Sequence, residues 1–177
     1  SYQVDRKEGV KNAIKIMKES GCDALKLEGG VEIIDTVKGI LDAGIPVMAH
    51  LGLTPQSINK FGTYAVRAKE EAEAEKLVSD ALLLQEAGCF SVVFEKVPAS
   101  LATKVSKELT IPTIGIGAGN GTDGQILVVD DMLGMTKGFS PKFLRRYADL
   151  NTVMTDAIGN YIRDVKSSDF PNSEESY

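Results

Sequence analysis

The sequence predicts an α/β protein in which parallel strands are covered by helices. Short apolar segments alternate with helical segments along most of the 177 residues, the apolar segments show no polar alternation, and the connections between them are short. Strands that are apolar on both faces are typical of a parallel sheet buried under helices. An α/β barrel and an open doubly wound sheet both satisfy this pattern.

The N-terminal part of the chain begins with a helix. Apolar residues recur at helical spacing from Arg6 to Ser20, and Gly21 ends the run. A short apolar segment follows and is closed by the run Glu28-Gly29-Gly30. The expected elements are a helix over 6–20, a strand over 22–27, a helix over 31–43 and a strand over 45–49.

The rest of the chain repeats the alternation. A segment rich in Glu, Ala, Lys and Leu ends at Gly88, and Pro98 stands in the first turn of the next helix, where its missing N–H costs nothing. The polar segment 166–177 is expected to be a loosely held tail. The expected elements are a helix over 70–87, a strand over 90–94, a helix over 98–109, strands over 111–116 and 125–129, and helices from 141 to about 165.

Composition excludes some classes of partner. The net charge is −5 and the basic residues are scattered, so no nucleic-acid partner is expected. No apolar run approaches the roughly 20 residues that span a bilayer, and no signal-like segment opens the chain. A cytoplasmic protein without a membrane partner is expected. Cys22 and Cys89 adjoin apolar segments and are interpreted as packing residues rather than a disulfide.

Polar residues stand at the carboxyl ends of the expected strands, where parallel α/β folds place their chemistry. Lys26 lies between two leucines, and an ammonium in such a strand needs a partner. One alternative is an ion pair with Glu28, which projects from the same strand face. The other is that Lys26 binds a carboxylate or oxyanion of a ligand.

Glu95 and His50 also follow apolar runs. A carboxylate that loses water at Glu95 would be more basic and suited to accept a proton, whereas the alternative is a glutamate that faces solvent or pairs with Lys96. His50 is the single histidine, and a base, a metal ligand or a structural hydrogen-bonding residue are all open. A metal here would need oxygen ligands, which points to magnesium-type chemistry.

The glycine-rich stretch 115–124 includes a formal GxGxxG match at residues 119–124. A strand-like segment follows it instead of a helix, and no acidic residue stands at the usual offset, so no dinucleotide site is expected. The glycines either let backbone N–H groups approach a ligand or turn the chain tightly.

Five sequence blocks, in this order and spacing, resemble the ketopantoate hydroxymethyltransferase family. They are "KLEGG" at 26–30, "HLGLTPQS" at 50–57, "FE" at 94–95, "VP" at 97–98 and "IPTIGIGAGNGTDGQILV" at 111–128. The resemblance implies a (β/α)8 TIM barrel of the phosphoenolpyruvate/pyruvate type. Such a barrel needs eight strands and roughly 250 residues. Residues 1–177 would then be a single partial barrel domain that supplies strands 4 to 8 and lacks the first three.

The resemblance also implies an activity. Family members transfer a hydroxymethyl group from 5,10-methylenetetrahydrofolate to 3-methyl-2-oxobutanoate, on the way to pantothenate and coenzyme A, and they use Mg²⁺ and assemble as homodecamers. Carried over by motif, Lys26 and His50 bind the substrate, Glu28 belongs to the metal site and Glu95 is the proton acceptor.

The same resemblance places two metal-binding aspartates and a substrate-binding serine in the first three strands, which a companion polypeptide could supply. The chain alone is therefore expected to be inactive. The amino-acid sequence of the loop 61–69 differs from the one that is usual in the family. Two rival functions remain: another metal-dependent enolate lyase of the isocitrate lyase or phosphoenolpyruvate mutase type, and a non-catalytic barrel fragment that acts in assembly.

Overall fold

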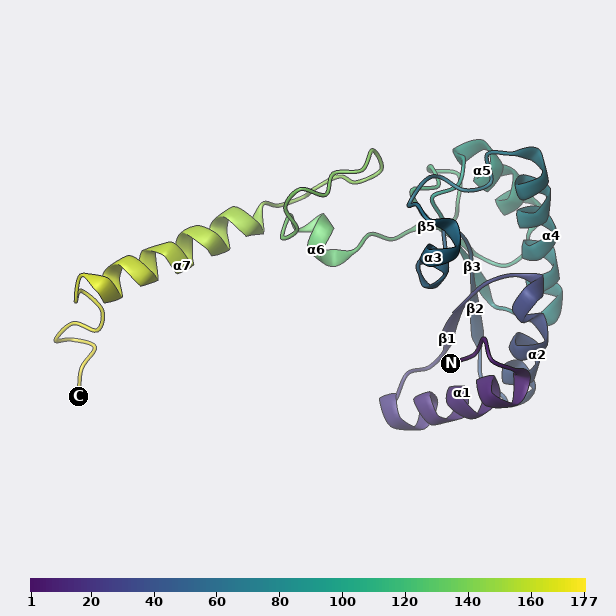
Figure 1. The fold of residues 1–177 in the computed structure, drawn as a ribbon, viewed down its shortest axis with the longest axis horizontal. Coiled ribbons are helices and arrows are strands. Elements are labelled where there is room, and N and C mark those ends of the chain that lie inside the picture. The colour runs from purple at the N-terminus through teal and green to yellow at the C-terminus, as the bar shows by residue number, and fades with distance from the viewer. The chain divides into compact units, whose positions relative to one another are not determined.

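The computed structural model describes all 177 residues, and the chain forms two compact units (Figure 1). Residues Ser1–Ile126 form the first unit, which contains the whole sheet, and residues Leu127–Tyr177 form the second, which contains only helices and loops. The α/β class predicted from the sequence is confirmed. The interpretation of residues 1–177 as one partial barrel domain, with a polar tail over 166–177, stays a prediction.

The sheet has five strands, and every neighbouring pair is parallel. The strands follow one another in chain order across the sheet, which is not closed. A barrel has this sequential order, whereas a doubly wound sheet reverses its order partway. The architecture is therefore that of an incomplete barrel. The strands are β1 (Leu25–Glu28), β2 (Val47–Gly52), β3 (Ser91–Glu95), β4 (Thr113–Ile116) and β5 (Gly124–Gln125).

Local sequence features explain where the helices of the first unit begin and end. The carboxylate of Asp5 accepts a hydrogen bond from the backbone N–H of Glu8 and starts α1, and Gly21 ends it at a φ of 69°. Pro98 caps α5 instead of standing inside its first turn. The helices are α1 (Arg6–Ser20), α2 (Ile34–Asp42), α3 (Ile58–Phe61), α4 (Glu71–Ala87) and α5 (Ala99–Glu108), with 3-10 turns η1 (Val31–Ile33) and η2 (Pro55–Ser57).

The hydrophobic core lies between one face of the sheet and helices α2, α4 and α5, which cover that face in Figure 1. Alternate strand residues supply the sheet side of this core, because successive side chains of a strand point to opposite faces. The other face carries the polar residues that the sequence singles out. The core residues of the central strands are Val47, Ala49, Leu51, Val92 and Phe94.

Two sequence predictions are wrong in the C-terminal third. In place of the strand expected over 125–129, β5 covers only Gly124 and Gln125, and Val129 already begins helix α6 (Val129–Met132). Ile126, Val128 and Val129 are exposed, so this apolar run lacks the neighbours that would hold it in a sheet. The helix expected from 141 begins only at Leu150, as α7 (Leu150–Lys166), where Asp149 caps its N-terminus.

The second unit consists of α6, α7 and the loop between them. Backbone N–H groups of Tyr147 and Leu150 return to the carbonyls of Met132 and Leu133 and close this loop. Helix α7 has no buried residue within this chain. After it, the ring of Phe170 packs edge-on against Tyr161 with 5.6 Å between ring centroids. None of the helices is both long enough and apolar enough to cross a membrane.

Both cysteines are free, as predicted. Cys89 is buried and packs in the core, while Cys22 is half-buried. Burial raises the pKa of the Cys89 thiol to about 11, so this side chain stays protonated at neutral pH and is unsuited to nucleophilic chemistry.

Candidate active site

The strand register brings the predicted site residues to one end of one sheet face. Glu28 of β1 is the register partner of His50 of β2, and His50 is the partner of Val93 of β3. Glu95 lies two residues beyond Val93 and therefore projects from the same face. Lys26 shares that face with Glu28. The expectation that these side chains meet at the carboxyl ends of neighbouring strands is confirmed.

His50 is the centre of this cluster and is only 3% exposed. Its Nδ1 atom lies 3.2 Å from the ammonium of Lys26 and 3.7 Å from Oε1 of Glu28. Its Nε2 atom lies 3.2 Å from Oε2 of Glu95. The imidazole of His50 on β2 thus links three charged side chains from its two neighbouring strands, β1 and β3.

The contacts fix the tautomer of His50. An ammonium can only donate, so Nδ1 must accept from Lys26 and the ring proton resides on Nε2. Although Nε2 is close to Glu95, the directions are unfavourable and no hydrogen bond forms, which leaves Nε2 as a buried polar atom without a partner. Such a donor is available to an oxygen atom that approaches Nε2.

Glu28 is held by two residues that the sequence alone did not identify. The hydroxyl of Tyr2 donates to the Glu28 carbonyl at 2.9 Å and accepts from the Glu28 N–H at 3.0 Å. The backbone N–H of Gln56 donates to Oε2 of Glu28 at 2.9 Å. Burial raises the pKa of Tyr2 despite its hydrogen bond with the Glu28 backbone, so the hydroxyl stays neutral. Sequence patterns do not reveal such contacts, because they join distant segments.

The geometry argues against the ion-pair alternative for both Lys26 and Glu95. Lys26 is exposed in this chain and contacts His50 instead of forming an ion pair with Glu28. Lys96 turns away from Glu95, and its ammonium donates to the carbonyl of Tyr64. The carboxylate of Glu95 therefore faces His50, with its side chain 19% exposed.

Gly52 allows the strands to approach at this end. Its φ is 91°, and a Cβ atom at this position would overlap the carbonyl oxygen of its register partner Glu95. That carbonyl accepts a hydrogen bond from the N–H of Leu53 at 2.8 Å. The backbone of Glu95 is thus anchored by β2 as well as by β4, and glycine is required for the first contact.

The chain does not by itself offer a complete magnesium site. No group of three or more His, Cys, Asp or Glu side chains in it is arranged so that it could hold a metal ion. Glu28 is the residue matched to the metal site, and one of its oxygens already accepts from Gln56. Because Mg²⁺ requires octahedral oxygen coordination, further ligands would have to come from water, substrate or residues outside this chain.

The glycine-rich stretch 115–124 has a packing role. A Cβ atom at Gly119 would overlap Ala99 of α5, and one at Gly121 would overlap Thr103 of the same helix. The second of the two interpretations is therefore supported: these glycines let a tight turn pass close to a helix.

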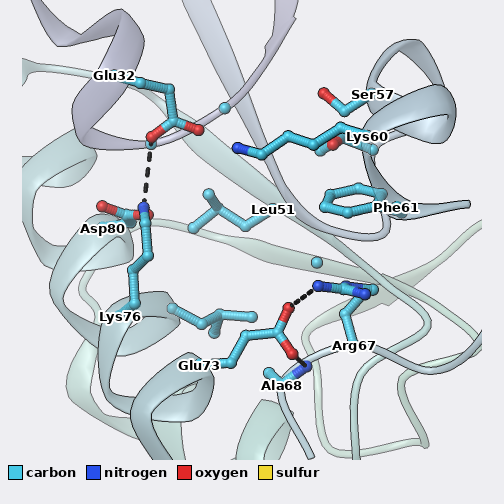
Figure 2. A pocket seen from close by; sticks show the side chains of 15 residues that line it. Glu32, Leu51, Ser57, Lys60, Phe61, Arg67, Ala68, Glu73, Lys76 and Asp80 are labelled. Carbon is cyan, nitrogen blue, oxygen red and sulfur yellow. Dashed lines mark hydrogen bonds and ion pairs between the residues drawn. The ribbon is translucent and has the colours of Figure 1, made fainter.

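A cavity of the first unit lies outside this cluster (Figure 2). It has a volume of about 390 Å³ and none of Lys26, Glu28, His50 and Glu95 lines it. Leu51 does, because consecutive residues of β2 point to opposite faces of the sheet. The geometry of the four residues, rather than cavity size, identifies the candidate active site.

Comparison with known proteins assigns the family. The family model described as ketopantoate hydroxymethyltransferase matches residues 1–173. The chain is similar to curated proteins named 3-methyl-2-oxobutanoate hydroxymethyltransferase, with 70% identity to that of Bacteroides fragilis, 70% to that of Phocaeicola vulgatus and 66% to that of Flavobacterium johnsoniae. Each alignment covers the whole chain and 65% of the relative. The chain therefore belongs to the ketopantoate hydroxymethyltransferase family.

Proposed function

We propose that this chain carries part of the active site of an enzyme that transfers a hydroxymethyl group from 5,10-methylenetetrahydrofolate to 3-methyl-2-oxobutanoate. The product would be 2-dehydropantoate, a precursor of pantothenate. The family and the names of the relatives support the reaction class. The observation that carries the proposal is the convergence of Lys26, His50 and Glu95 at the carboxyl ends of neighbouring strands.

The first step is removal of the C3 proton of the keto acid. Glu95 is the carboxylate placed to accept it, because it faces the cluster and forms no ion pair with Lys96. The ammonium of Lys26 attracts the substrate carboxylate, and the free Nε2–H of His50 is available to the oxygen that gains negative charge. In this arrangement Lys26 stabilises the negative charge of the substrate carboxylate, and His50 stabilises the negative charge that develops on the keto oxygen.

The second step forms the new carbon–carbon bond. C3 of the enolate attacks the methylene carbon of the folate, the carbon–nitrogen bonds to that carbon break, and water supplies the hydroxyl oxygen. The two folate nitrogens released in this way each take up one proton, one from Glu95, which restores the carboxylate, and one from the water that supplies the hydroxyl. The atoms balance with one water consumed.

Further expectations from the resemblance belong to the same proposal. They are dependence on Mg²⁺, use of the folate as co-substrate, assembly as a homodecamer and a cytoplasmic location. In the metal site, Glu28 would act together with residues of the first three strands, and bound Mg²⁺ would polarise the keto acid as a Lewis acid.

An assay on the complete enzyme tests the reaction. We expect 2-dehydropantoate to form only when 3-methyl-2-oxobutanoate and 5,10-methylenetetrahydrofolate are both present. The Lys26→Met variant should raise KM for the keto acid about tenfold or more, because a charge-assisted contact is lost. Control variant Lys38→Met removes an exposed lysine of α2 and should leave KM unchanged.

The same assay distinguishes this reaction from the two rival functions, an enolate lyase and a non-catalytic assembly fragment. Cleavage of a 2-keto acid without folate would identify an enolate lyase and contradict the proposal. Absence of turnover by the complete enzyme under all of these conditions would favour an assembly role without catalysis.

A further inference from the structure

The cavity of Figure 2 is built from one continuous part of the chain, from Gly29 to Asp80. Its walls come from the turn after β1, the end of β2, helix α3 and the first turns of α4. Charged side chains of both signs line it. Which of them already have partners determines what the cavity can bind.

The carboxylates of the cavity are matched within its walls. Glu32 and Asp80 both pair with Lys76, and Asp80 also accepts from the N–H of Val31 at 3.0 Å. Burial would lower the pKa of Lys76, but the hydrogen bond and charge of Asp80, with the charge of Glu32, raise it above its usual value. The ammonium of Lys76 therefore stays charged at neutral pH, and each of the three side chains has a partner.

The third carboxylate, Glu73, is matched in the same way. It pairs with Arg67 and accepts a hydrogen bond from the N–H of Ala68 at 2.7 Å. Ala68 adopts a left-handed backbone conformation with a φ of 55°, which is rare for a residue with a side chain. Both carboxylate oxygens of Glu73 therefore have a partner within the chain.

Two donors, in contrast, are unmatched. The ammonium of Lys60 forms no ion pair or hydrogen bond within the chain, and its side chain extends into the cavity in Figure 2. Nε of Arg67 is buried and also lacks an acceptor. Arg67 additionally lies 4.2 Å over the ring of Phe61, which fixes the guanidinium beside an aromatic and apolar wall.

We propose that this cavity binds a small organic carboxylate, whose charge pairs with Lys60 and Arg67 and whose apolar part contacts Phe61 and Leu51. The ammonium of Lys60 and Nε of Arg67 are the donors without a partner and would favour an anion, and the apolar contacts would favour an organic anion over an inorganic one. The site is distinct from the cluster around His50, and the inference does not rest on the reaction proposed above. Its ligand can influence that cluster, because Gly52 lines the cavity and contacts the backbone of Glu95.

Calorimetric titration of the complete enzyme with benzoate tests the proposal, with benzamide as a neutral ligand of the same shape. We expect benzoate to bind and benzamide to bind at least tenfold more weakly. The Lys60→Met variant keeps the length of the side chain and should weaken benzoate at least tenfold, since a charge-assisted hydrogen bond is lost. Lys38→Met, on the exposed side of α2, should leave the affinity unchanged.

The Lys26→Met variant distinguishes this cavity from the candidate active site, where a carboxylate could also bind. Benzoate affinity should be unchanged in Lys26→Met. The proposal would be overturned if benzoate did not bind or if benzamide bound equally well. It would also be overturned if Lys60→Met bound benzoate with wild-type affinity, or if only Lys26→Met lost affinity.

Discussion

At the scale of single residues, His50 connects the site. The sequence pointed to Lys26, Glu28, His50 and Glu95 because polar residues that follow apolar runs stand out. It could not show that the imidazole accepts from Lys26 and presents its other nitrogen toward Glu95, because those contacts depend on strand register. Nor could it identify Tyr2 as the partner of the Glu28 backbone.

Replacing His50 with Phe tests this central position. The aromatic ring keeps most of the volume, but Lys26 and both carboxylates lose their shared neighbour. We expect kcat/KM of the complete enzyme to fall about tenfold or more, because the loss of one hydrogen-bonded contact costs about 1.5 kcal/mol or more near charged groups. Met48→Leu, two residues earlier on the same face of β2, serves as the control. Equal kcat/KM for His50→Phe and wild type would contradict the role given to His50.

Gly52 offers a second test at the same scale. Gly52→Ala should lower the free energy of unfolding by about 3 kcal/mol, because strain at a positive φ adds to overlap with the Glu95 carbonyl. Gly62 has a φ of 67° but open space around it, so Gly62→Ala should cost only about 1 kcal/mol. Urea unfolding of both variants measures the difference. Equal losses of unfolding free energy in the two variants would mean that the close approach at Gly52 does not contribute to the effect of Gly52→Ala.

At the scale of elements, most of the alternation of helices and strands could be predicted. Apolar periodicity and terminal glycines located α1 and α4 to within one residue, because caps are local in sequence. The prediction of a strand over 125–129 was wrong because strands, unlike helix caps, are not determined locally in sequence. A β-strand depends on neighbours that are distant in sequence, and Ile126 and Val128 are exposed.

The start of β4 depends on a side chain from a later loop. Asp123 accepts hydrogen bonds from the N–H and the hydroxyl of Thr113, at 2.8 Å and 2.9 Å, and these hold the pKa of Asp123 below its usual value. A lowered pKa in the folded state stabilises the fold above the unfolded value of 3.8, and this stabilisation is lost as the pH falls further.

We therefore expect Asp123→Ala to lower Tm at neutral pH, and the difference from wild type to shrink as the pH drops below 3.8. Thermal unfolding across this range measures it. Asp130→Ala, at an exposed carboxylate without a hydrogen bond, should match wild type throughout. A Tm difference for Asp123→Ala that does not change with pH would rule out this linkage.

At the scale of the whole molecule, the sequential order of the parallel strands decides between the two architectures that the sequence allowed. Periodicity could not decide it, because strands of a barrel and of a doubly wound sheet have the same composition. The sheet of this chain is open, and the chain spans 65% of the length of the curated relatives that it matches. The activity proposed here is therefore that of the complete enzyme.

Residues 1–177 alone should show no hydroxymethyl transfer. Their sheet is not closed, and they gather no group of three acidic, histidine or cysteine ligands for a metal. The product assay on this purified chain, beside the complete enzyme, measures the difference. Turnover by the chain at the rate of the complete enzyme would contradict this account of the molecule.

The most direct test of the central claim follows the C3 proton of 3-methyl-2-oxobutanoate. Deuterium exchange at C3 in heavy water, catalysed by the complete enzyme, reports proton removal without the folate step. If Glu95 accepts the proton, Glu95→Gln should slow exchange by about a hundredfold or more while binding of the keto acid is nearly unchanged. Exchange at the wild-type rate in Glu95→Gln would remove Glu95 from its proposed role and contradict the mechanism.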